Sequence, residues 1–332
     1  MEFLPLIWAV IIGTAVMLYV ILDGFDLGVA LLFPFVDDES QRDQMMRSVA
    51  PFWDGNETWL VMGGVGLLVA FPLAYAVIMP ALYLPVIFML LGLIFRGVAF
   101  EFRTLARDKR WWNLAFAAGS LVATLSQGAI LGGLIQGIRV ENNAYAGGPF
   151  DWASPLSLLC GVGLTAGYAL LGATWLIWRT EGPIVGHARR AALVALAAVL
   201  ASMGGVSLYT PLAFDEIAAR WFAVPNIFWL WPVPVVTLLT AFAAWRWIET
   251  AQDGRPFFAT IVLFLLGYLG LIISRFPYLV PPSLTIWDTA AVPSSQAFML
   301  AGTVVLLPLI LGYTAWSYWV FRGRVREGES YH

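Results

Sequence analysis

The sequence has little charge and no basic run. Charged residues make up only 12% of its 332 residues and hydrophobic residues make up 60%, whereas soluble domains contain about 25% charged residues. This composition excludes an ordinary soluble fold, and the lack of a basic run excludes a nucleic-acid-binding protein. The class that remains is a polytopic membrane protein, whose main partner is the lipid bilayer.

Cysteine and histidine are also scarce, which limits the kinds of site that the chain can build. Cys160 is the single cysteine and lies in an apolar run, so we expect a small core residue. The two histidines, His187 and His332, lie outside every apolar run. No metal site is therefore expected, and no intramembrane imidazole is available to ligate haem. Walker A, HExxH and GxSxG motifs are absent too, so we expect no self-contained active site.

Long apolar runs predict an all-α bundle of about nine transmembrane helices, organised as two four-helix units plus one helix. The chain is interpreted as a single integral-membrane domain, 1–332, with a cytoplasmic loop over 36–57 and an outer loop over 276–296. The first run has neither a basic segment before it nor a cleavage site after it, which predicts a retained helix. The nine expected helices cover residues 5–35, 58–71, 76–102, 114–138, 155–178, 188–210, 227–248, 257–275 and 297–321.

The basic residues are unevenly distributed between the two sides of this bundle. If the N-terminus is outside, 15 of the 18 lysines and arginines fall on the inner side, and only Arg139, Arg220 and Arg275 fall outside. The positive-inside rule then places the N-terminus outside and the C-terminus in the cytoplasm.

Two carboxylates, Asp23 and Asp26, lie near the inner end of the first helix and share one helical face. A charged side chain in apolar sequence costs about 2.5–3.5 kcal/mol on insertion scales unless it is paired or faces a wet cavity. Two interpretations remain open. At least one carboxylate serves a functional site, or both are satisfied by an arginine or by helix N-termini inside the bundle.

Arg96 ends an apolar run that begins at Ala76, and its permanent charge requires a carboxylate or the headgroup layer. Candidate partners at the inner ends of the helices are Asp26, Asp54 and Glu101. We expect charge pairing that involves Arg96, Asp23 and Glu101.

The segment from Trp53 to Trp59 places Asp54 and Glu57 immediately before an apolar run. A helix that begins near Gly55 would put Asp54 in an N-cap-like position, and this structural role alone could explain the residue. The functional alternative is proton entry at the inner surface, through Asp54 together with Glu57 and Asp26.

Several motifs together resemble subunit II of the cytochrome bd-type quinol oxidases, including the cyanide-insensitive branch. The resemblance covers the whole chain, although some members have Gln-Val where this chain has Glu57-Thr58. The motifs are Asp23-Gly24-Phe25-Asp26-Leu27-Gly28, Trp53-Asp54-Gly55-Asn56-Glu57-Thr58-Trp59-Leu60, Phe95-Arg96, and Pro282-Ser283-Leu284-Thr285-Ile286-Trp287-Asp288 with Ser294-Ser295.

The resemblance implies a haem-free subunit that forms a heterodimer with a larger subunit I in the bacterial cytoplasmic (inner) membrane. As a terminal oxidase of the respiratory chain, the complex would oxidise quinol and reduce oxygen to water. Subunit I would carry two b-type haems and one d-type haem, or a further b-type haem. A small accessory subunit and a bound quinone are further partners that the family allows.

By the same resemblance, Asp54 corresponds to a carboxylate at the cytoplasmic mouth of a proton path into subunit I. Trp59, and with it Trp53, corresponds to an oxygen route or a quinone contact. Two other classes stay open, a haem-free transporter or channel that binds an ion through the helix-end charges, and a purely structural scaffold subunit. Clustering of the charges at one end of the bundle, rather than at the midplane, disfavours the transporter.

Overall fold

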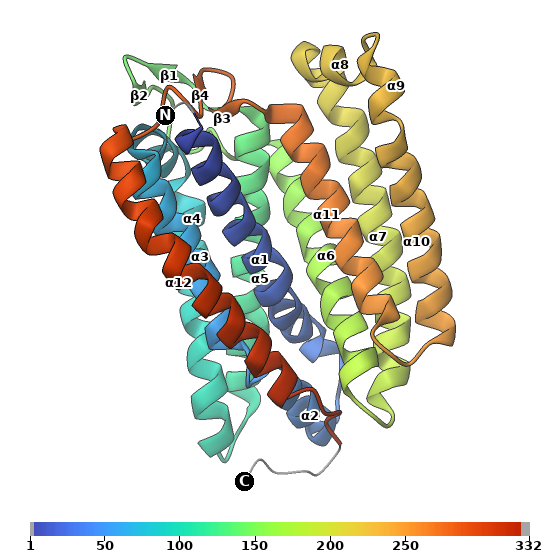
Figure 1. Ribbon diagram of the computed structural model, residues 1–332. Coiled ribbons are helices and arrows are strands. Elements are labelled where there is room, and N and C mark those ends of the chain that lie inside the picture. Colours follow the sequence, from blue (N-terminus) through green and yellow to red (C-terminus); the bar gives the residue numbers. More distant parts are fainter. Residues whose placement is uncertain (1–2, 327–332) are drawn as a thin grey trace.

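The computed structural model describes residues 3–326 and is almost entirely helical (Figure 1). Its long helices are α1 (Leu4–Leu32), α3 (Trp53–Ala70), α4 (Pro72–Leu105), α5 (Arg110–Gln136), α6 (Pro155–Arg179), α7 (Ile184–Ala213), α10 (Pro232–Thr250), α11 (Arg255–Arg275) and α12 (Pro293–Val320). The shorter elements are η1 (Phe33–Phe35), α2 (Glu39–Val49), α8 (Asp215–Phe222), α9 (Asn226–Leu230) and the strands β1 (Val140–Glu141), β2 (Ala144–Tyr145), β3 (Tyr278–Val280) and β4 (Leu284–Thr285).

The long helices form two four-helix units plus one helix, which confirms the predicted architecture. In the first unit, α1 and α4 each contact both α3 and α5. In the second unit, α6 and α10 each contact both α7 and α11. Contacts of α6 with α1 and α5 join the two units, and α12 crosses the outside of the first unit diagonally (Figure 1).

Eight helices in residues 3–326 are long and apolar enough to cross a membrane, one fewer than predicted. The remaining segment is α3, which has 18 residues and carries Asp54 and Glu57 near its start. At 1.5 Å per residue it is about 27 Å long, close to the thickness of a bilayer core. It also begins at Trp53 rather than near residue 58, so the predicted start was about five residues late.

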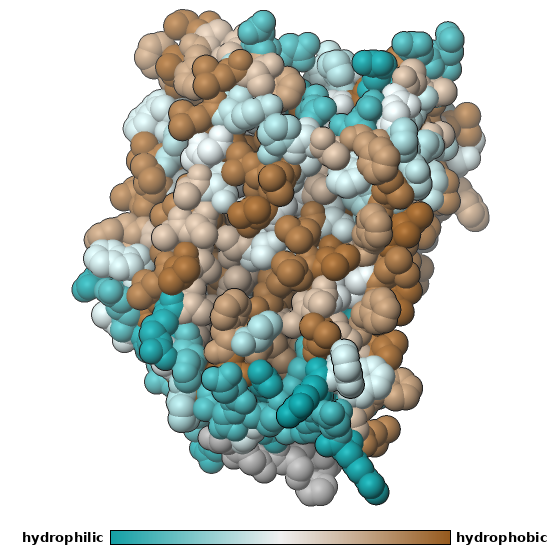
Figure 2. Space-filling view, turned by 180° about the vertical axis from the view of Figure 1, so that it is seen from behind, coloured by the Kyte–Doolittle hydropathy of each residue, from teal (hydrophilic) through white to brown (hydrophobic). Residues whose placement is uncertain are grey.

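One end of the bundle carries α2 and the other carries the two small hairpins, β1–β2 and β3–β4 (Figure 1). We refer to them as the α2 end and the hairpin end. Figure 2, a view from behind, shows hydrophobic residues over the middle of that face and hydrophilic residues gathered at the α2 end. This distribution is typical of a protein whose middle lies in lipid.

The two connections that were predicted as loops contain local structure. Residues 36–57 include the 11-residue helix α2, whose N-terminus is capped by Asp38 through a bond from the Ser40 amide. Residues 276–296 include the β3–β4 hairpin, in which the carboxylate of Asp288 accepts bonds from the amide and hydroxyl of Thr285 at 2.9 and 2.6 Å. The second connection also ends early, because α12 starts at Pro293.

Helix α12 is held mainly at its two ends. No residue in the most apolar stretch of α12 is buried by other parts of this chain. At the hairpin end, the Gln296 amide donates to the carbonyl of Ala70 at 3.0 Å, and the indole of Trp8 donates to the carbonyl of Gln296 at 3.1 Å. At the α2 end, the hydroxyl of Tyr318 donates to Asn56 at 2.8 Å. The apolar middle of α12 is left to lipid or to a partner.

Candidate functional site

A buried ion-pair cluster lies where α1, α3 and α4 meet near the α2 end. Arg96 on α4 donates from Nη1 to Asp23 Oδ1 on α1 at 2.5 Å and from Nη2 to Glu57 Oε2 on α3 at 3.2 Å. The side chains of Arg96 and Asp23 are fully buried, and that of Glu57 is 27% exposed. One guanidinium therefore links a carboxylate inside the bundle to one that reaches the surface.

A second buried carboxylate, Asp26, lies one helical turn further along α1. Its Oδ2 accepts a 2.7 Å bond from Asn56 Nδ2, and Asn56 Oδ1 accepts the bond from Tyr318 on α12. Asn56 also donates to the carbonyl of Leu22 at 3.1 Å. The neighbouring residues Asn56 and Glu57 therefore connect α3 to both carboxylates of α1, to Asp26 directly and to Asp23 through Arg96.

The cluster contains buried polar atoms that have no hydrogen-bond partner within residues 3–326. These are Asp23 Oδ2, Asp26 Oδ1, Arg96 Nε and Trp59 Nε1. Three carboxylates, those of Asp23, Asp26 and Glu57, also face a single guanidinium. Buried polar groups are costly unless they are bonded. The arrangement therefore offers sites for internal water or for a proton.

The other residues that the sequence singled out take separate positions. Asp54 is exposed in the first turn of α3, and Phe52 is the N-cap residue, so the expected N-cap position of Asp54 was wrong. Trp53 stacks on Phe100 with ring centroids 4.9 Å apart. Trp59 is only 1% exposed and packs in the cluster with Ala15 and Tyr19 of α1.

Glu101 does not join the buried cluster. It is exposed on α4 and forms no ion pair in the described part of the chain, so Glu57 takes the place beside Arg96 that was expected for it. Five residues at 100° each put Glu101 about 140° around the helix from Arg96. A carboxylate in that position points away from a guanidinium that faces the bundle interior.

A buried chain of polar residues that the sequence did not indicate continues from Asp23 towards the second unit. Tyr19 lies one turn before Asp23 and interacts with it electrostatically. Gln127 on α5 donates to the Tyr19 hydroxyl at 2.8 Å and accepts from the Tyr168 hydroxyl on α6 at 2.6 Å. Each residue alone looks like an ordinary polar residue in a helix, and only the packing of α1, α5 and α6 brings them together.

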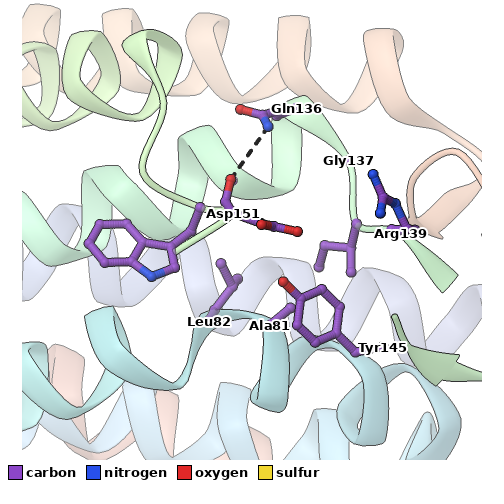
Figure 3. Close-up of a pocket in the computed structure, with 10 residues that line it drawn as sticks. Ala81, Leu82, Gln136, Gly137, Arg139, Tyr145 and Asp151 are labelled. Carbon is purple, nitrogen blue, oxygen red and sulfur yellow. Dashed lines mark hydrogen bonds between the residues drawn. The ribbon is translucent and has the colours of Figure 1, made fainter. Parts of the chain in front are cut away.

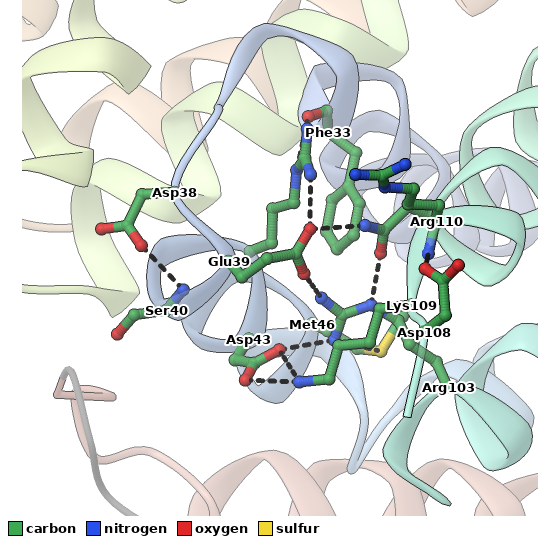
Figure 4. A network of polar contacts seen from close by, with 12 residues as sticks. Phe33, Asp38, Glu39, Ser40, Asp43, Met46, Arg103, Asp108, Lys109 and Arg110 are labelled. Carbon is green, nitrogen blue, oxygen red and sulfur yellow. Dashed lines mark hydrogen bonds and ion pairs between the residues drawn. The ribbon is translucent and has the colours of Figure 1, made fainter. Parts of the chain in front are cut away.

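A separate ion-pair network fixes α2 to the ends of α4 and α5 (Figure 4). Arg103 is 2% exposed and contacts Glu39 at 2.8 Å, Asp43 at 2.6 Å and Asn113 at 2.5 Å. Lys109 adds a 2.9 Å pair with Asp43. This network fixes the position of α2 relative to the ends of α4 and α5.

Asp43 should make the attachment of α2 dependent on pH. Partial burial alone would raise the pKa of Asp43, but the bonds and charges of Lys109 and Arg103 outweigh it and hold this pKa below its usual value. Because the pKa of Asp43 is lower in the folded state than its unfolded value of about 3.9, the ionised carboxylate stabilises the folded state at pH values above about 3.9. This stabilisation is lost as the pH falls through the folded pKa.

We therefore expect the α2 amides to exchange hydrogen faster below about pH 4, after correction for intrinsic rates. In the Asp43→Asn variant this dependence on pH should largely disappear, whereas the exposed control Asp37→Asn should behave like the wild type. Identical pH dependence in Asp43→Asn and wild type would show that Asp43 does not control the attachment.

The sequence and the fold were compared with known proteins. Residues 4–321 match the family model of cytochrome bd terminal oxidase subunit II. The chain is 32% identical to cytochrome bd-I ubiquinol oxidase subunit 2 of Escherichia coli (strain K12), with 99% of this chain and 97% of the relative covered. It is 28% identical to cytochrome bd ubiquinol oxidase subunit 2 of Bacillus subtilis (strain 168), with 97% of each covered.

A solved structure shows the same fold. A chain in the structure of bd oxidase from Geobacillus thermodenitrificans aligns with a TM-score of 0.73 and 20% sequence identity, covering 96% of this chain and 98% of that chain. The family match extends over nearly all of the sequence, and the structural match over nearly all of the fold. The chain therefore belongs to the cytochrome bd terminal oxidase subunit II family and is a multi-pass membrane protein.

Proposed function

We propose that this chain is the haem-free subunit of an oxidase complex that couples the oxidation of ubiquinol to the reduction of oxygen to water. Membership of the family supports a heterodimer with a haem-bearing subunit I. The choice of ubiquinol rests on the names of the relatives. The bacterial cytoplasmic membrane is the proposed location, with the α2 end inside because 15 of the 18 cations lie on that side.

Residues 3–326 of this chain do not fit a haem, although the family implies haem in the complex. His187, the one histidine among residues 3–326, is exposed at the start of α7, away from the bundle interior. The described residues also contain no group of three or more histidine, cysteine or acidic side chains that could hold a metal ion. We therefore assign the haems to subunit I and give this chain a role in supplying protons and in supporting the partner.

The observation that carries the proton-entry proposal is a series of charged side chains that leads from the surface to the interior. Asp54 is exposed at the α2 end, and Glu57 lies one turn further along the same face of α3. Glu57 contacts Arg96, which contacts the buried Asp23. Arginine stays protonated, so Arg96 acts as a fixed countercharge while carboxylates and water carry the proton.

We propose that subunit I binds against the exposed side of α3. Residues at three- and four-residue intervals along α3 are exposed in this chain, which gives one stripe that begins at Asp54. A partner that covers this stripe would receive protons directly from Asp54 and Glu57. The members of the stripe are Asp54, Thr58, Val61, Val65 and Leu68.

The Asp54→Asn variant of the complete complex tests the proposal. We expect normal assembly and normal haem absorption, because Asn has nearly the same shape as Asp and the Asp54 side chain forms no ion pair within residues 3–326. Oxygen consumption with quinol should fall at least about tenfold, because a positioned proton-transfer group contributes about 10²–10⁴-fold to a rate. The matched control is Asp37→Asn, another exposed carboxylate at the same end.

Other outcomes distinguish the remaining functions. Normal turnover in Asp54→Asn would reject proton entry at this residue and favour a scaffold subunit. Purification of the native complex without a haem protein or its visible absorption would reject the oxidase itself and favour a transporter or channel.

A further inference from the structure

A cavity of about 300 Å³ lies at the hairpin end, far from the ion-pair cluster. One wall is α4 at Leu82, where the helix is locally irregular (φ −118°, ψ 17°) between Pro80 and Pro85. The opposite wall is the end of α5, which turns into the β1–β2 hairpin at Gly137 (φ +98°). The backbone is therefore irregular on both walls where it borders the cavity.

A positively charged and a negatively charged side chain line this cavity (Figure 3). The carboxylate of Asp151 points towards the Tyr145 hydroxyl, and Arg139 lies on the far side of the same space. Both charged groups act electrostatically on Tyr145. Arg139 nevertheless has no salt-bridge partner anywhere in residues 3–326. The cavity thus presents a cation and a carboxylate that are not neutralised by each other.

The polar wall is held in place by the loop that follows the hairpin. Asp151 Oδ2 accepts the Gly148 amide at 3.0 Å, and the Tyr145 hydroxyl donates to the Gly148 carbonyl at 2.6 Å. The Gln136 amide reaches the carbonyl of Asp151 at 3.5 Å, and the Trp152 indole donates to Pro149 at 3.0 Å. These bonds leave Asp151 Oδ1 and the guanidinium of Arg139 available to an occupant.

The remaining wall is apolar and lies beside transmembrane helices. Ala81 and Leu82 come from α4, and Ile138 and Trp152 flank the end of α5. Tryptophan is typical of the membrane–water interface. An occupant should therefore combine a zwitterionic head with an apolar part. The volume of the cavity is at the lower end of the usual range for ligand pockets, which suits a headgroup rather than a whole lipid.

We propose that this cavity binds the phosphoethanolamine headgroup of a membrane phospholipid. The primary ammonium would donate to Asp151 and Tyr145, and the phosphate would accept from Arg139. A choline headgroup has no N–H to donate, and a glycerol headgroup has no positive charge for Asp151. The inference concerns binding at the hairpin end and does not depend on proton entry at the α2 end.

Native mass spectrometry of the purified, delipidated complex tests this proposal. Phosphatidylethanolamine, phosphatidylcholine and phosphatidylglycerol with identical acyl chains are added separately. We expect about tenfold stronger retention of phosphatidylethanolamine, from the charge-assisted bonds it alone can complete. Asp151→Asn should remove this preference, whereas Arg139→Gln should weaken the retention of all three lipids, because each of them carries the phosphate. Arg107→Gln, an exposed arginine at the α2 end, should keep it.

Haem absorption of each variant shows that the complex has assembled, so loss of the preference reports on the cavity. Equal retention of the three lipids would overturn the proposal. A preference that survives in Asp151→Asn, or unchanged retention of all three lipids in Arg139→Gln, would overturn it as well. Soluble O-phosphoethanolamine is the probe for a free zwitterion, and binding as tight as that of the lipid would reassign the cavity to a soluble ligand.

Discussion

The Arg96→Gln variant is expected to lose stability severely and to yield little intact complex. Arg96 is the countercharge of the fully buried Asp23 and also pairs with Glu57. Removing one partner of a buried ion pair costs about 3–5 kcal/mol, because the other charge stays buried without compensation. Here the loss is aggravated by Asp26, a second buried carboxylate on the same face of α1.

The yield of intact complex in size-exclusion chromatography and its thermal midpoint measure this effect. Arg107→Gln is the control, since it removes an exposed arginine from the short connection that follows α4. The double variant Asp23→Asn/Arg96→Gln should be more stable than Arg96→Gln alone, because it removes the uncompensated charge. Wild-type yield and midpoint in Arg96→Gln would contradict the assignment of Arg96 as the countercharge.

The general fold could be predicted because apolar length is a strong signal. Runs of about 20 apolar residues separated by charged ends allow few solutions other than a membrane bundle. The same signal fails for α2 and for the start of α3. The apolar part of the buried face of α2 consists of Met45, Met46 and Val49 alone, and the first turn of α3 is interrupted by Asp54 and Gly55. Hydropathy does not detect helical turns that are partly polar.

The candidate site could be predicted only as a collection of charges at one end. Alternating helix directions bring Asp23, Asp26, Arg96 and Glu57 to the same depth, whichever helices are neighbours. Whether Glu57 or Glu101 pairs with Arg96 depends on which face of α4 points into the bundle. The sequence of α4 does not indicate that face, because the helix is apolar on almost every side. The contact of Tyr318 with Asn56 joins residues 262 positions apart, and no spacing rule could indicate it.

The Gly28→Ala variant should have the second large effect, because the two four-helix units are in backbone contact at this residue. A Cβ atom on Gly28 would lie 1.8 Å from the carbonyl oxygen of Tyr168, and one on Gly172 would lie 2.3 Å from the carbonyl carbon of Gly28. The obstructing atoms are backbone, so no side-chain rotation can relieve the clash. Helices α1 and α6 would have to separate, and overpacking of this kind costs about 1–3 kcal/mol or more.

Separation of α1 and α6 would also disturb the polar site, since Gly28 lies two residues beyond Asp26. We expect a lower thermal midpoint of the complex and, by the proposed function, lower turnover in the fraction that assembles. Gly204→Ala is the matched control, because a Cβ there on α7 would meet nothing within 4 Å. Alanine is a better helix former than glycine, so the control should be neutral or slightly stabilising. Equal thermal midpoints for Gly28→Ala and Gly204→Ala would show that α1 and α6 can move apart at no cost. The backbone contact at Gly28 would then not be what holds Asp26 in its position in the polar site.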